Sequence, residues 1–261
     1  MGKKFIVLSI VFALLLVAVT SVSAITNGQP DGDEHPYVGV VFDLDQTHFC
    51  SGSAISPDVF ITAAHCFNDG DIVSLTFESS PGDLGAEVYY GFVYQHPDYC
   101  PDCGPGLHGA FQNDIAVISP LVNADLASPD LDRYGQLPAL GLVDTLRNQT
   151  AVTLVGFGFQ DFITGGGPPV PTFDETRHVA QAKLQTGSHN SGESLIKLSA
   201  RQGNDQGGFC FGDSGGPVLL GETDLILALS AFSPNDRCAG VTYTSRIDTE
   251  SALNFINGFN P

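Results

Sequence analysis

The stretch Gly212-Asp213-Ser214-Gly215-Gly216-Pro217 determines how the rest of the chain is interpreted. It places a serine among glycines, on a backbone that can turn sharply and point two N–H groups at one place. A serine hydroxyl is a weak nucleophile unless a base removes its proton, and acyl transfer also needs hydrogen-bond donors for the developing oxyanion. The stretch therefore predicts a histidine and an acid elsewhere in the sequence.

Two upstream segments supply these groups. The histidine is His65, in Thr62-Ala63-Ala64-His65-Cys66, and the acid is Asp114, in Asn113-Asp114-Ile115-Ala116-Val117. The pattern Gly212-x-Ser214-x-Gly216 also matches the nucleophile elbow of α/β-hydrolases, whose histidine follows the serine in the chain. No histidine follows His189 in this sequence, so the order histidine, aspartate, serine excludes that fold.

This order and its flanking residues resemble the trypsin/chymotrypsin family of serine endopeptidases. The resemblance covers most of the chain from Ile25 onward. It is carried by Cys50–Ile55 with Ile61–Cys66, by His96–Tyr99 with Asn113–Ala116, and by Cys210–Pro217. It implies an all-β fold, with two six-stranded antiparallel β-barrels packed around an active site between them and a short C-terminal helix.

The chemistry and the resemblance give the site residues the same roles. Ser214 attacks the scissile carbonyl, His65 takes its proton and returns it to the leaving amine, and Asp114 holds the imidazole tautomer. The backbone N–H groups of Gly212 and Ser214 form the predicted oxyanion hole. Each residue alone has an ordinary explanation, as a turn serine, a structural histidine or a capping acid. The occurrence of all three motifs together, in this order along the chain, favours an active endopeptidase. The alternative is a catalytically silent, protease-like binding or adhesion protein.

Runs of β-branched and aromatic residues between turn clusters predict the strands. The clearest runs are Tyr37–Phe42, Val59–Thr62, Ile72–Phe77, Ile115–Ile118, Ala151–Gly156 and Leu225–Ser230. The polar stretch 119–138 is a predicted crossing linker. It separates an N-terminal barrel, residues 25–136, which carries the histidine and aspartate, from a C-terminal barrel, residues 137–261, which carries the serine. We expect a short helix over Ser251–Asn257, and a surface loop without strand or helix over Thr164–Pro171.

The first 24 residues have the pattern of a signal peptide. Lys3 and Lys4 give a basic start, an apolar run follows, and Val22-Ser23-Ala24 is a small-residue cleavage site. The alternative, a membrane anchor, is disfavoured because the apolar run is short for a membrane span. We therefore expect a secreted, soluble protein that begins near Ile25, with no membrane association after the signal is removed.

The formal net charge of −19 limits the possible partners. Nucleic acid is excluded, because phosphate binding needs clustered Lys and Arg. The ordinary explanation of the charge is solubility, and the alternative is steering of basic substrates. The expected partners are protein or peptide substrates of a monomeric enzyme that needs no cofactor and no metal.

The sequence contains six cysteines, which can form disulfides if the protein is exported as predicted. The resemblance implies a disulfide between Cys50 and Cys66 and another between Cys210 and Cys238. Cys100-Pro101-Asp102-Cys103 departs from the family pattern. A local disulfide is the favoured interpretation; half a zinc site with the nearby His96 and His108, or a thiol–disulfide exchange site, are the alternatives. The other histidines, including His35 and His178, have no predicted partner and are expected in solvent.

The resemblance also places the primary specificity pocket. Gly208 stands at its base, where a carboxylate would be needed to bind Arg or Lys side chains. Ser230 and Phe232 fall on one wall, and Gly240 on the opposite wall. A Phe at the entrance narrows the pocket, unless Phe232 turns away, so we expect cleavage after small or medium uncharged residues.

The same resemblance implies a role for Asp213 in activation. Ile25-Thr26-Asn27-Gly28 resembles the family's mature amino terminus, whose ammonium pairs with the carboxylate beside the nucleophile. Because Ile25 directly follows the predicted signal cleavage site, signal removal itself would free the activating ammonium. Pairing raises the pKa of that ammonium above its free value of about 7.7–8.0, so the stabilisation is present at lower pH and lost as pH rises through the folded pKa.

Overall fold

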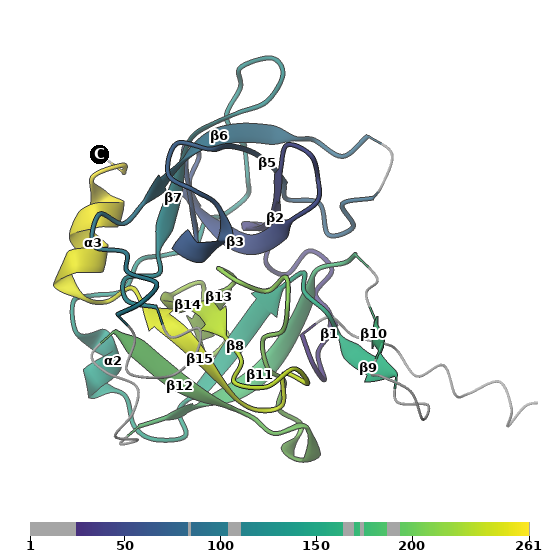
Figure 1. Cartoon of the computed structure of the whole chain (residues 1–261), viewed down its shortest axis with the longest axis vertical. Coiled ribbons are helices and arrows are strands. Elements are labelled where there is room, and N and C mark those ends of the chain that lie inside the picture. The colour runs from purple at the N-terminus through teal and green to yellow at the C-terminus, as the bar shows by residue number, and fades with distance from the viewer. Residues whose placement is uncertain are drawn as a thin grey trace, which may run out of the picture.

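A computed structural model describes residues 25–82, 85–103, 111–163, 170–172, 175–186 and 194–260. The predicted signal peptide, His108 and most of the predicted loop 164–171 lie outside these ranges. The described chain forms two antiparallel barrels, one above the other in Figure 1, with few helical residues. Within these ranges no helix is long and apolar enough to cross a bilayer.

The first barrel is closed by six antiparallel strands in the order β2-β3-β4-β7-β6-β5. They are β2 (Val38–Asp43), β3 (Phe49–Ser56), β4 (Val59–Thr62), β5 (Ile72–Thr76), β6 (Tyr89–Gln95) and β7 (Ala116–Val122). Strand β6 shows the period of two that a barrel wall requires. Tyr89 and Val93 are buried, whereas Tyr90, Phe92 and Tyr94 are exposed on the outer face.

The second barrel has the order β11-β12-β15-β14-β13-β8 and is closed by pairing of β8 with β11. Its strands are β8 (Ala151–Gly156), β11 (His178–Gln185), β12 (Leu195–Ala200), β13 (Pro217–Leu220), β14 (Ile226–Phe232) and β15 (Gly240–Arg246). A separate hairpin joins β9 (Asp161–Ile163) to β10 (Val170–Thr172), and α2 (Leu142–Thr145) precedes β8. The predicted fold, two six-stranded barrels, is confirmed.

The two ends of the described chain connect the barrels. Strand β1 (Gln29–Pro30) precedes the first barrel but pairs with β11 of the second. Helix α3 (Glu250–Asn257) follows the second barrel but lies beside the first, where Ser251 Oγ is 3.1 Å from Nε2 of His96 (Figure 1). His96 is buried and has a structural contact here. The N-terminal strand β1 and the C-terminal helix α3 therefore each contact the other barrel, and both help to hold together the interface at which the site lies.

A buried arginine also links the N-terminal segment to both barrels. Arg177 donates from Nε to Asp31 (2.9 Å) and from Nη1 to the carbonyls of Val38 and Phe77. His35 places Nδ1 2.5 Å from the same Asp31 carboxylate, and its backbone N–H donates to it as well. The expectation that His35 lies in solvent is wrong, because Asp31 and Arg177 draw it into a buried ionic cluster.

Three particular expectations differ from the structure. Strand β7 continues to Val122, so the linker begins after it rather than at residue 119. Val170 and Pro171 belong to β10, so this end of the predicted loop is a strand. His178 is buried in β11, not exposed, because strand pairing places it inside.

Candidate active site

The structure brings His65, Asp114 and Ser214 into one hydrogen-bonded chain. Nδ1 of His65 lies 2.7 Å from Oδ2 of Asp114, and Nε2 lies 3.0 Å from Oγ of Ser214. The backbone N–H of His65 also donates to Oδ1 of Asp114, at 2.9 Å. Both carboxylate oxygens therefore accept from the same histidine, which fixes the ring while its second nitrogen faces the serine.

Local backbone structure places each of these side chains. His65 lies in a 3₁₀ turn, Ala64–Cys66, directly after β4. Asp114 precedes β7 and follows Asn113, whose φ of 49° and side-chain bond to the Asp98 carbonyl form a tight turn. Asn is among the few residues that adopt this left-handed conformation readily. The Asn-Asp sequence therefore aims a fully buried carboxylate at the histidine.

The environment of His65 favours its protonated form. Burial lowers the pKa of His65, but the negative charge of Asp114 and the hydrogen bond to it raise the pKa more, so it lies above its ordinary value of 6.5. The ring is still accessible at one edge, because 21 % of the side chain is exposed. A base of this kind can accept a proton from Ser214 and hold it beside a charged partner.

The serine loop precedes β13 and needs glycine at two points. Gly212 and Gly215 have φ of 92° and 79°, where other residues are strained. A Cβ on Gly215 would collide with Oγ1 of Thr62, and one on Gly212 with the Phe49 ring. Ser51 of β3 fastens the loop by donating its N–H to the Ser214 carbonyl and its hydroxyl to the Gly212 carbonyl.

The N–H groups of Gly212 and Ser214 have no hydrogen-bond acceptor among the described residues. The neighbouring N–H groups are occupied, since Asp213 donates to the Cys210 carbonyl and Gly215 to the Ser230 carbonyl. The loop thus leaves free the two donors beside the hydroxyl. Such a pair of donors can bind an oxyanion that develops on a carbonyl attacked by Ser214.

Asp213 points away from Ser214 into the second barrel and is fully buried. Its carboxylate accepts from the N–H of Gly158 (2.7 Å) and from the N–H of Cys210 (2.8 Å). Burial raises the pKa of Asp213 to about 7, although these two hydrogen bonds lower it. No salt bridge neutralises it in the described part of the chain. A buried carboxylate of this kind is costly until a cation reaches it.

Ile25 lies at the same end of the second barrel. It is fully buried in the core cluster that includes Leu154 and Phe209. Thr26 pairs with Gly208 through backbone bonds in both directions and through its hydroxyl. The predicted mature terminus is therefore inserted into the protein. The pairing of Ile25 with Asp213 stays a prediction.

One pocket lies beside Ser214 and includes two of the four residues expected in the specificity pocket. It has a volume of about 230 Å³ and lies against His65 and Ser214. Ser230 and Phe232 line it, together with Phe111, Phe209, Cys210, Phe211, Ala231, Ser233 and Cys238. Gly208 and Gly240 are not among its lining residues. The Phe232 ring stacks on Tyr243 with 4.8 Å between ring centres, so it is held in place at the pocket wall.

A second hollow lies on the other side of the nucleophile. It has a volume of about 350 Å³ and is lined by Gly212 and Ser214, by His65, and by Thr47, His48, Phe49, Cys50, Phe159 and Phe211. Neither space is lined by a lysine, an arginine or a carboxylate.

Phenylalanines around the nucleophile are the main feature that the sequence does not predict. Phe111 packs against His65 with 5.5 Å between ring centres, and Phe211 is 53 % exposed above the pocket. Phe209 is buried next to Gly208, where it fills space at the inner end of the pocket. The signal available in the sequence is composition, since 18 phenylalanines accompany no tryptophan. Composition alone does not say which of them reach the site.

All three predicted disulfides form. They join Cys50 to Cys66, Cys100 to Cys103, and Cys210 to Cys238. The Cys100–Cys103 bond leaves this motif no thiolate with which to bind zinc. Among the described residues, the cluster of three potential metal ligands is His48, Cys50 and Cys66, and there the disulfide removes both thiolates. Three disulfides fit an extracellular protein.

Two closed barrels that bring a serine, a histidine and a buried aspartate together define the two-barrel class of trypsin-like proteins. The chain belongs to the trypsin family, since the family model described as Trypsin matches residues 25–256. This membership supports a serine protease function.

Relatives and solved structures agree with this assignment. Chymotrypsin-like elastase family member 3B of Homo sapiens is 29 % identical over 273 residues, covering 91 % of this chain and 93 % of that protein. The Macaca mulatta protein of the same name is 30 % identical over 184 residues, 66 % of this chain and 65 % of its own length. An HL collagenase structure has a TM-score of 0.68 at 21 % identity, covering 90 % of this chain and 97 % of the other, and shows the same fold.

Proposed function

We propose that this protein is a serine endopeptidase that hydrolyses peptide bonds through an acyl-enzyme on Ser214. The observation that carries the proposal is the hydrogen-bonded chain from Asp114 through His65 to Ser214, next to two unoccupied N–H donors. Each part alone has a structural explanation. Their combination has the geometry that acyl transfer requires.

The steps follow from the positions of these atoms. Oγ of Ser214 forms a bond to the scissile carbonyl carbon as its proton moves to Nε2 of His65, and the carbonyl oxygen takes the negative charge. The N–H groups of Gly212 and Ser214 bind that oxygen. When the C–N bond breaks, Nε2 gives the proton to the leaving amine, and the acyl group stays on Ser214. Water then attacks the ester carbonyl and loses a proton to Nε2; when the ester C–O bond breaks, Nε2 gives that proton to Oγ of Ser214, and the carboxylic acid is released.

Asp114 keeps the ring oriented and stabilises the imidazolium in both halves of the reaction. Because the pKa of His65 lies above 6.5, the neutral base accumulates only above that pKa. We therefore expect the rate to rise with pH through the folded pKa of His65. The stability of the fold changes with pH in the opposite direction. The ion pair between His65 and Asp114 stabilises the fold fully below the pKa that His65 has in the unfolded chain, and this stabilisation is lost as pH rises through the pKa of His65 in the folded protein.

Covalent labelling distinguishes this proposal from a silent, protease-like binding protein. A sulfonyl fluoride or an organophosphate should add one label per chain, on Ser214, and should abolish peptide hydrolysis. His65→Ala should react far more slowly because no base remains. A properly processed protein that takes no label at Ser214 would support the binding protein instead.

We propose that cleavage follows small or medium uncharged residues. The support is the uncharged pocket of about 230 Å³, with Phe209 at its inner end and Phe232 stacked at its wall. Without a carboxylate among its lining residues, an arginine or lysine side chain would lose hydration there without an ion pair. A panel of peptides that differ only in the residue before the scissile bond tests this, and fastest cleavage after Arg or Lys would rule it out.

We propose further that the protein is secreted and is activated by removal of residues 1–24. The freed ammonium of Ile25 would pair with Asp213, a buried carboxylate that has no cation in the described chain, and would hold the serine loop in order. This is supported by the burial of Ile25 beside the same loop. Amino-terminal sequencing of the secreted protein is the test. A fully active enzyme that begins upstream of Ile25 would contradict this account of activation.

A further inference from the structure

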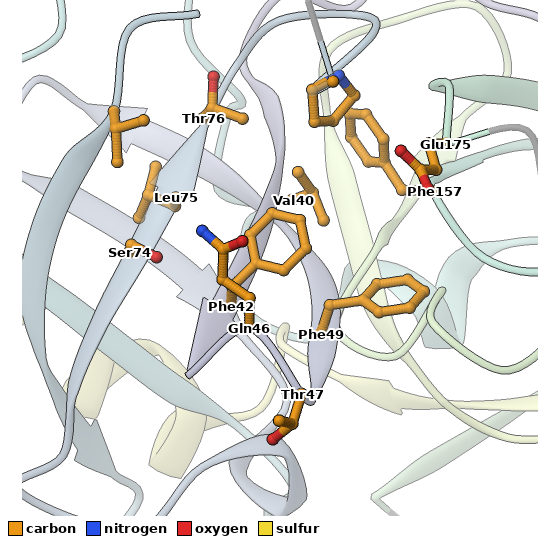
Figure 2. Close-up of a pocket in the computed structure, with 13 residues that line it drawn as sticks. Val40, Phe42, Gln46, Thr47, Phe49, Ser74, Leu75, Thr76, Phe157 and Glu175 are labelled. Carbon is orange, nitrogen blue, oxygen red and sulfur yellow. The ribbon is translucent and has the colours of Figure 1, made fainter. Parts of the chain in front are cut away.

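A large pocket lies next to the second hollow at Ser214, which takes the leaving-group side of a substrate whose residue before the scissile bond occupies the proposed specificity pocket. It has a volume of about 440 Å³ and is lined mostly by apolar side chains. Phe42 of β2 and Phe49 of β3 present partly exposed rings to it, whereas Val40, Leu75 and Phe157 also line it but are at most 2 % exposed. Figure 2 shows these labelled side chains gathered around one space, with Glu175 near Phe157 on the side away from β5.

This pocket adjoins the hollow at the nucleophile. Thr47 and Phe49 line both, and Phe49 also packs under Gly212 of the serine loop. Phe42 pairs with Phe49 across β2 and β3, and their rings are 6.0 Å apart. A peptide that leaves Ser214 past Phe49 would therefore run toward this pocket along the two side chains that the spaces share, Thr47 and Phe49.

The strand register gives the length of peptide required. Phe49 on β3 pairs with Phe42 on β2, and Phe42 pairs with Ser74 on β5. Two strand spacings correspond to roughly 10 Å, which an extended peptide spans in about three residues. The side chain that enters the pocket thus belongs to a residue about three positions beyond the one that contacts Phe49.

We propose that this pocket binds an apolar side chain of the substrate, three to six residues after the scissile bond. The proposal rests on the proposed endopeptidase function and names its substrate class: polypeptides that extend well past the cleaved bond and carry a leucine-sized or aromatic residue there. The charged lining side chain of this pocket is Glu175, which is exposed. An acidic residue at that position of the substrate is repelled by this carboxylate and by the strongly negative protein.

Internally quenched peptides test the proposal on the full mature protein. All share one sequence through the second residue after the scissile bond, and carry Leu, Ala or Asp at each of positions three to six. At one position Leu should raise kcat/KM by roughly 10-fold over Ala, as expected for burial of one such side chain. Asp at that position should be poorer than Ala.

Two variants assign the preference to the pocket. Val88 is 38 % exposed and lines the pocket, so Val88→Glu should reduce the Leu preference to within twofold without affecting a short ester that ends at the scissile bond. Glu175→Gln should improve the Asp peptides relative to the Ala peptides. The matched control is Leu140→Glu, an exposed leucine that does not line the pocket, which should keep the full preference.

The outcomes separate this proposal from the proposed function. A protein that hydrolyses the short ester and is labelled at Ser214, yet prefers no residue at positions three to six, would overturn the pocket assignment alone. The same holds if Val88→Glu and Leu140→Glu behave alike. A protein that does neither reaction would overturn the endopeptidase function, and the pocket assignment with it.

Discussion

Replacing Asp114 with asparagine tests the roles assigned to the residues of the site. The change replaces one carboxylate oxygen by an NH₂ group. The carboxylate accepts from two donors of the same residue, the backbone N–H of His65 at 2.9 Å and its Nδ1 at 2.7 Å. An amide has one oxygen and one NH₂ group, so it can accept from only one of these donors. If its oxygen keeps the backbone N–H, its NH₂ faces Nδ1.

The expected loss of rate follows from this conflict. Facing an NH₂ donor, Nδ1 must be the unprotonated nitrogen, and the proton moves to Nε2. That nitrogen lies 3.0 Å from Oγ of Ser214, where it can then only donate. General base assistance and imidazolium stabilisation are both lost, so kcat should fall by roughly 10³–10⁴. This corresponds to about 4–5 kcal/mol of transition-state stabilisation.

The assay is kcat and kcat/KM from pH 5 to 9 on one peptide substrate, with thermal unfolding as a check on folding. The pKa of His65 is raised by Asp114, so the Asn variant should also lose the raised apparent pKa in its rate profile. The matched control is Asp98→Asn, an exposed Asp in the same loop, which should change kcat less than twofold. A folded Asp114→Asn protein that keeps more than a tenth of kcat would refute the assigned roles.

Three further predictions concern stability. Gly215→Ala places a Cβ against Thr62 at a φ of 79°, so the free energy of unfolding in urea should fall by about 3 kcal/mol; a loss below about 0.5 kcal/mol would contradict the contact. Arg177→Met leaves the buried Asp31 without its guanidinium and should cost about 3–5 kcal/mol by the same measurement, whereas an unchanged midpoint would show that the ion pair is unimportant. In a chain that keeps the residues before Ile25, the unfolding free energy should fall as pH rises from about 4 to about 7, because the folded pKa of Asp213 lies above its unfolded value of 3.8. Asp213→Asn should flatten that slope in urea titrations at several pH values, and an unchanged slope would assign it to other groups.

The residues of the proposed site can be predicted from the sequence because local backbone geometry restricts them. Gly212 and Gly215 have positive φ, and Asn113 turns the chain before Asp114. The motifs around the nucleophile and the acid therefore contain residues required by the backbone conformation as well as residues required by the chemistry. Strands β4 and β8 are predicted residue for residue for a similar reason. Strand β4 is buried throughout and β8 is buried after Ala151, and both are short runs rich in apolar and β-branched residues, which favours a strand over a helix.

Other strands are harder to predict from the pattern of apolar residues in the sequence. Strand β6 exposes Tyr90, Phe92 and Tyr94, and β11 exposes Gln181 and Lys183 between buried residues, so neither is a continuous apolar run. Their period of two was a usable signal, but the pairing that buries one face is a property of the whole barrel. The buried cluster of Asp31, His35 and Arg177 joins segments more than 140 residues apart, so no local pattern reveals it.

The pockets are the part of the site least accessible to prediction. Which phenylalanines reach the nucleophile depends on how the two barrels pack, and Phe209 and Phe111 come from different barrels. The large pocket lined by Phe42 and Phe157 also spans both barrels, so its lining cannot be found from spacing along the chain.

The central claim is that Ser214 carries the acyl group of the substrate, and trapping that intermediate tests it most directly. The mature protein is mixed with an activated ester, quenched in acid within the first turnover, digested and analysed by mass spectrometry. We predict that the peptide containing Ser214 gains the mass of the acyl group, and that His65→Ala gains it at a far lower rate. Turnover of the ester with the acyl group on another residue, or with no acylated peptide and no burst, would contradict the claim.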